Sequence, residues 1–203
     1  MSVTTTAAAA VGRPRSQASH DAIITACLKL FREKPYGEVS IEAIATEAGV
    51  GKATIYRWWP NKLALAIDVL MEQLHLPEFQ YSGKNIRRHL LKGLKACHEN
   101  MLQGDLAQVI SGVVADCQRD EKLREQFYEG FFAKLREIGM RDLAHAMALG
   151  QLSDKLDRDV FLDQLFGCLY YRVLIANKPV DDKYLQTLID NLLPADTLPA
   201  GAI

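Results

Sequence analysis

Apolar residues recur every three or four positions along almost the whole 203-residue sequence. This spacing places the apolar side chains of a helix on one face, where they can be buried together. No segment shows the alternation of apolar and polar residues that is typical of a half-buried strand. The predicted fold class is therefore all-α. Helices are expected at about 17–33, 41–48, 51–58 and 62–76, with longer ones from about 82 onward that include 158–176 and 182–193.

Capping residues and prolines divide these predicted helices. Ser40 and Asn61 carry side-chain oxygens that can accept hydrogen bonds from the first turn of the helix that follows. Pro77 ends the fourth helix, because proline disfavours a helical residue before it. These signals predict an N-terminal domain at 13–76 and a C-terminal domain at 78–194, with a disordered tail at 1–12 and a frayed tail at 195–203.

The charge of the chain is unevenly distributed. Its 24 Lys and Arg nearly balance its 25 Asp and Glu, which gives a net charge of -1. Residues 13–62, however, hold eight basic and five acidic side chains, and the rest of the chain is acidic. A basic segment joined to an acidic one suggests a module that binds a polyanion, attached to a part that does not.

Composition also excludes several classes of protein. A hydrophobic content of 49% is too high for a disordered chain. No apolar run approaches the roughly 18–20 residues that would span a bilayer, so no membrane segment is expected. The start of the chain lacks the charged and apolar regions of a signal peptide, and a cytoplasmic protein is therefore predicted.

Residues that could support catalysis or bind metal do not form a recognisable set. The four cysteines form no CxxC pair and fall at apolar helical positions, so we expect four reduced, buried thiols. The histidines of the C-terminal part lack metal-ligand spacing, and there is no phosphate loop or serine nucleophile motif. No enzyme activity, metal or cofactor is therefore expected. The residues concerned are Cys27, Cys97, Cys117 and Cys168, and His75, His89, His98 and His145.

The segment 41–60 fits a helix-turn-helix at its most restrictive positions. Ala45 is small where the two helices would cross, and Gly49 suits a left-handed turn residue. Ile55 is placed to anchor the second helix in the core. In this motif the N-terminal half of the second helix enters the major groove of DNA.

The wider stretch 13–75 resembles the DNA-binding domain of TetR-family transcriptional regulators. The resemblance rests on the basic lead-in, Leu30-Phe31, the Ser40 cap, Gly49-Val50-Gly51, Ile55-Tyr56-Arg57-Trp58-Trp59 and Asn61-Lys62. Trp58 stands where the family usually has His, and Trp59 where it usually has Phe. The family fold has an N-terminal three-helix DNA-binding domain and a C-terminal helical bundle for effector binding and dimerisation. The resemblance implies a homodimeric regulator, most often a repressor, that binds double-stranded operator DNA and senses a small-molecule effector.

The candidate DNA contacts lie in the N-terminal part. Arg13 and Arg15 are expected on a flexible arm, which either contacts phosphates or the minor groove or is only a basic tail. Lys52 or Thr54 is expected to read base edges. The resemblance implies phosphate contacts for Tyr56 and Lys62. Further candidates are Ser40 as a cap near a phosphate, Gly51 and Ala53 at close backbone approach, and Trp58 in the core, in the groove or on the sugar backbone.

Candidate sites in the C-terminal part rest on apolar stripes. An effector pocket is expected among Cys97, Met101, Cys117, Phe127 and Phe131, which otherwise form core. A dimer interface is expected among Leu162, Phe166, Leu169, Tyr170, Val173, Leu185 and Ile189, because helix 158–176 has two broad apolar faces. The alternatives are an activator, an effector-independent DNA binder, or a small-molecule carrier or enzyme with a vestigial helix-turn-helix.

Overall fold

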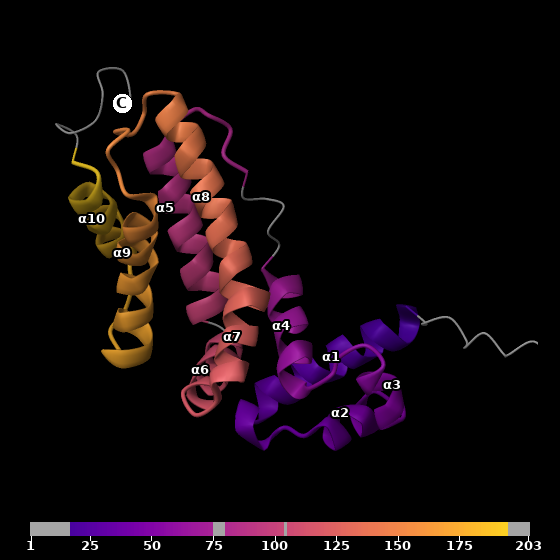
Figure 1. Cartoon of the computed structure of the whole chain (residues 1–203). Helices are drawn as coiled ribbons and strands as arrows, with labels where there is room; N and C mark the ends of the chain where they lie inside the picture. The colour runs from indigo at the N-terminus through magenta and orange to yellow at the C-terminus, as the bar shows by residue number, and fades with distance from the viewer. Residues whose placement is uncertain (1–16, 75–79, 104, 195–203) are drawn as a thin grey trace, which may run out of the picture.

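The computed structural model of the chain describes residues 17–74, 80–103 and 105–194. All regular elements in these ranges are helices, which confirms the all-α prediction (Figure 1). None of these helices combines the length and the apolar character that crossing a membrane requires.

Four helices form the N-terminal part, and their caps follow the sequence signals. They are α1 (Gln17–Glu33), α2 (Ile41–Glu47), α3 (Lys52–Tyr56) and α4 (Lys62–Gln73). The hydroxyl of Ser40 accepts a hydrogen bond from the Ala43 amide at 3.1 Å, which caps α2. The side chain of Asn61 accepts one from the Ala64 amide at 2.8 Å, which caps α4. Both caps satisfy amides that a helix start leaves without a partner.

Longer helices form the C-terminal part. They are α5 (Ile86–Cys97), α6 (Asp105–Cys117), α7 (Glu121–Phe127), α8 (Ala133–Ala148), α9 (Arg158–Tyr170) and α10 (Asp182–Leu192). In Figure 1, α9 and α10 lie at the edge of the molecule farthest from the N-terminal helices, with α5 and α8 between. Three segments take a π-helical form: His98–Leu102 after α5, Tyr128–Phe132 between α7 and α8, and Tyr171–Ile175 after α9.

The N-terminal helices pack directly against the C-terminal bundle, with α4 against α6, α7 and Tyr128–Phe132. Close approach there requires glycine: a Cβ on Gly130 would lie 2.9 Å from the Ile67 side chain. The side chain of Asn61 also donates a hydrogen bond to Gln126 of α7 at 3.1 Å. The two parts therefore meet through specific contacts at both ends of the segment 126–130.

The cysteines are all free, but they are not all buried. Cys27 and Cys117 lie in the core, whereas Cys97 and Cys168 are only half-buried, so the expectation of four buried thiols was wrong for these two. Although the Cys97 residue is partly accessible, its thiol group is enclosed by its neighbours, and this raises the pKa of the thiol to about 12. This thiol is therefore protonated at neutral pH and a poor nucleophile.

Candidate DNA-binding surface and ligand cavity

The turn between α2 and α3 has the geometry that the helix-turn-helix requires. Gly49 has a φ of 65°, in the left-handed region that glycine adopts without steric cost. The Val50 amide closes the turn by donating to the Ala45 carbonyl at 3.0 Å. Ile55, which is fully buried, then fixes α3 against the core. The orientation of α3 is thus set by packing on one face, while its other face stays in solvent.

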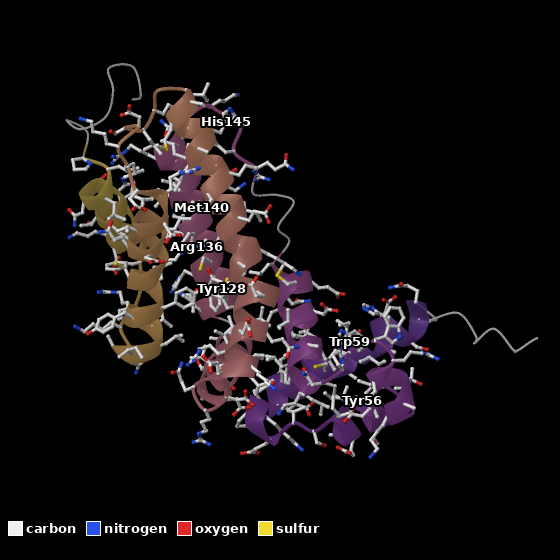
Figure 2. The ribbon with its side chains drawn as sticks, viewed as in Figure 1. Tyr56, Trp59, Tyr128, Arg136, Met140 and His145 are labelled. Carbon is white, nitrogen blue, oxygen red and sulfur yellow. The ribbon has the colours of Figure 1, made fainter. Side chains whose placement is uncertain are left out.

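The exposed face of α3 carries most of the candidate DNA contacts. Gly51, Lys52, Ala53 and Tyr56 are exposed, and Thr54 is half-buried. Tyr56 is 51% exposed and lies far from the C-terminal bundle (Figure 2). These residues come from the cap and the first turns of one helix, so their side chains project from one small surface.

Lys52 has an internal partner on this surface. Its ammonium lies 2.9 Å from a carboxylate oxygen of Glu42, and this hydrogen bond raises the pKa of Lys52 and lowers that of Glu42. Both side chains are exposed, and ion pairs of this kind contribute little in water. A phosphate or a base edge can therefore compete with Glu42 for the ammonium.

Lys62 does not lie on the exposed face. Its ammonium donates to the Tyr36 backbone carbonyl at 2.9 Å and lies 4.1 Å from the centre of the Tyr36 ring. Burial lowers the pKa of Lys62, which nevertheless has this carbonyl and ring as partners. The Tyr36 carbonyl takes one of the three N–H donors of the ammonium, so the phosphate contact implied by the family resemblance stays a prediction.

The two tryptophans pack toward α1. Trp59 is buried, and its indole N–H donates to Asp68 at 2.7 Å. Trp58 is half-buried, with its ring edge-on to His20 at a centroid distance of 4.8 Å. Trp58 therefore packs against the fold with part of its side chain in solvent, and its contact with DNA stays a prediction. Arg13 and Arg15 lie outside the described residues.

A cavity of about 520 Å³ lies between α5, α8 and α9. Each helix contributes residues spaced three or four positions apart, so the cavity follows one face of each. Cys97 and Met101, both expected to line a pocket, do so. The lining comprises Leu74, His89, Leu90, Gly93, Ala96, Cys97, Asn100, Met101, Tyr128, Phe132, Leu135, Arg136, Ile138, Gly139, Asp142, Leu162, Asp163, Phe166, Gly167 and Tyr170.

Three residues expected in a pocket lie elsewhere. Cys117, Phe127 and Phe131 are buried in the core and do not line this cavity. The rings of Phe127 and Phe131 stack on each other at 5.4 Å. Phe132, one position along the chain, lies on the cavity instead, because successive side chains of a helix point in different directions around its axis.

Two polar clusters border the cavity, and sequence reasoning identified neither. At one end His89 Nε2 lies 2.9 Å from a carboxylate oxygen of the buried Asp142, whose other oxygen accepts from Arg141 at 3.1 Å. At the side, Arg136 binds Asp163 at 2.8 Å (its position on α8 is shown in Figure 2). The partners are separated by 53 residues in the first cluster, so no local pattern signals the pair.

The residues expected at a dimer interface face the interior of the protomer. Leu162, Leu169, Leu185 and Ile189 are buried, Phe166 and Tyr170 line the cavity, and Val173 is half-buried. The outward face of α9 and the segment after it instead carries Val160, Tyr171 and Ile175. Tyr171 is 64% and Ile175 is 75% exposed. The exposed apolar stripe is therefore rotated around the helix from the one expected.

Both parts of the chain match known protein families. Residues 23–69 match the family described as bacterial regulatory proteins, tetR family, and residues 83–192 match the tetracyclin repressor-like C-terminal domain. The uncharacterized HTH-type transcriptional regulator YdeS of Bacillus subtilis is 33% identical over 184 residues, which cover 89% of this chain and 90% of that protein.

Solved structures show the same fold. The TetR family transcription regulator SCO0332 superposes with a TM-score of 0.72 at 29% identity, covering 87% of this chain and 97% of the other. FadR from Bacillus subtilis, solved in complex with stearoyl-CoA, gives a TM-score of 0.69 at 19% identity, covering 86% and 98%. With both parts of the chain matched, the protein belongs to the TetR family of transcriptional regulators.

Proposed function

We propose that this regulator binds double-stranded operator DNA as a homodimer, represses transcription in the cytoplasm, and is released by a small-molecule effector. In this proposal residues 13–76 bind DNA and residues 78–194 bind the effector and the second protomer. The proposal assigns no catalytic residue and no cofactor. The observation that carries it is the pairing of an exposed α3 surface with a cavity in the same protomer.

The α3 surface supports specific roles. Lys52 and Thr54 lie where side chains reach base edges, and Ala53 can touch a thymine methyl group. Gly51 permits close approach of the backbone, and Tyr56 is placed to donate its hydroxyl to a phosphate. Ser40, at the start of α2, is a further phosphate contact. Lys62 is a further phosphate contact, made through donors that the Tyr36 carbonyl does not use, and Trp58 supports the surface by packing on His20.

Replacement of Lys52 by alanine tests this assignment. We expect binding to the preferred DNA site to weaken about ten- to hundredfold, because a good base contact is lost. Binding to random DNA should change much less. Gel shifts on genomic fragments at several salt concentrations measure both affinities, and they also test for the sequence-selective binding that a small-molecule carrier would lack.

A matched control is Glu42→Gln, which removes the negative charge that pairs with Lys52 and leaves the lysine in place. This variant should bind the preferred site at least as tightly as the wild type. Equal losses on preferred and random DNA for the Lys52 variant would show that the lysine contacts phosphate and does not read bases.

A dimer surface is proposed on the outward side of α9 and α10. Val160, Tyr171 and Ile175 form an exposed apolar stripe, and half-buried Tyr184 and Leu188 lie on α10, which packs beside α9. Two such helix pairs related by a two-fold axis would form a four-helix contact. This register replaces the one expected from the sequence, whose main residues are buried within the protomer.

Contacts between the cavity and α4 support a mechanism of release. Tyr128 and Phe132 line the cavity, while Gly130, between them, contacts Ile67 of α4. A ligand that shifts Tyr128–Phe132 would therefore move α4, and with α4 the α3 surface that precedes it in the sequence. If the ligand favours an arrangement in which the two recognition helices are wrongly spaced, operator affinity falls.

A further inference from the structure

The cavity is elongated along the helices that form it. Its lining on α5 extends from His89 to Cys97, which at 1.5 Å per residue is about 12 Å, and continues past the end of α5 to Asn100 and Met101. Two glycines on the lining leave open space beside them: a Cβ built on Gly93 or on Gly167 would meet nothing within 4 Å beyond its chain neighbours and the backbone of its own helix. Between the polar clusters the lining is aliphatic or aromatic. The shape suits an extended apolar molecule, with polar partners for one end.

The charges on the lining do not suit an anion. Arg136 is the lining residue with a permanent positive charge, and four of its five N–H donors are already used by Asp159 and Asp163. The carboxylates of Asp142 and Asp163 also border the cavity. A bound carboxylate would lose its water and face the buried charge of Asp142, while Arg136 is already engaged by the carboxylates of Asp159 and Asp163.

The end of the cavity at His89 and Asp142 can bind an uncharged polar group. Asp142 is buried and accepts from His89 and Arg141 on its two oxygens. Oδ1 already accepts from both Nε and Nη2 of Arg141, whereas Oδ2 accepts from His89 and has capacity for a second hydrogen bond, so a ligand hydroxyl can donate to Oδ2. A hydrogen bond to a charged acceptor is among the stronger ones in a protein interior.

We propose that the cavity binds an elongated apolar molecule with no negative charge, whose terminal hydroxyl donates to Asp142. The inference rests on the proposed function, in which this cavity is the effector site. It adds the chemical class of the ligand: an alcohol of medium chain length, in preference to the fatty acid of the same length.

Isothermal calorimetry of the full chain with decanol and with decanoate at pH 7.5 tests this preference. Decanol should bind and raise the melting temperature, and decanoate should bind at least about tenfold more weakly, because burial of an unpaired carboxylate is costly. In the double variant Asp159→Asn/Asp163→Asn, Arg136 loses both carboxylate partners. Decanoate should bind this variant at least about tenfold more tightly than the wild type.

Ala96→Leu locates the binding. Ala96 lines the cavity, and a leucine there should abolish decanol binding, whereas Ala115→Leu at an exposed position of α6 should leave it unchanged. If decanoate binds the wild type as tightly as decanol, the inference about charge is overturned and the cavity remains an effector site. If no probe binds, or if Ala96→Leu has no effect, the effector role of the cavity is contradicted as well.

Discussion

The double variant Tyr171→Asp/Ile175→Asp is expected to sediment as a monomer at micromolar concentration. Both side chains are more than half exposed on the protomer, so the substitutions should leave the fold intact while placing charges in the proposed dimer contact. Operator affinity should fall by about 10²–10⁴, because the two half-sites are no longer bound by linked recognition helices. Analytical ultracentrifugation and gel shifts measure the two effects.

Leu149→Asp is the control for this variant. Leu149 is 50% exposed, at the end of α8 and outside the proposed dimer surface. The Leu149→Asp protein should have the same mass in solution and the same operator affinity as the wild type. If the double variant remained a dimer with wild-type affinity, the protomers would have to meet through another surface.

Leu169→Arg should have a different effect, although Leu169 lies only two positions from Tyr171. Leu169 is fully buried inside the protomer, so an arginine there has no route to water and no partner. We expect a loss of about 4–5 kcal/mol in the free energy of unfolding. Urea denaturation followed by circular dichroism measures it. Tyr171→Arg, at an exposed position of the same helical segment, should lose little stability.

These two variants distinguish the observed register of α9 from the one expected from the sequence. A Leu169→Arg protein with wild-type stability and a lower mass in solution would show that Leu169 lies in the dimer interface. A protein that unfolds more readily, with the Tyr171 variant stable, agrees with the burial in the structure.

Local signals predicted the helices well. Ser40, Gly49 and Asn61 each act through neighbouring residues, so their roles as cap, turn and cap could be inferred from short stretches of sequence. The helix-turn-helix was predictable for the same reason, since its small residue, glycine and anchor lie within ten positions.

The orientation of α9 could not be predicted in this way. The apolar residues of α9 occur on several sides of the helix, so their periodicity does not distinguish the face that meets the core from the face in solvent. The residues that line the cavity could not be predicted either, because Phe131 in the core and Phe132 on the lining are adjacent and chemically alike. Lys62 shows a further limit: its partner is a backbone carbonyl, which no sequence pattern reveals.

The central claim is that occupation of the cavity controls DNA binding. The most direct measurement is the affinity of the wild-type protein for its preferred DNA site, with and without a compound that binds the wild type but not Ala96→Leu. We expect the compound to weaken DNA binding by about 5- to 150-fold, the usual range of coupling between two sites. The Ala96→Leu protein should bind the same DNA without responding to the compound. An unchanged DNA affinity of the wild type at saturating compound would contradict the account.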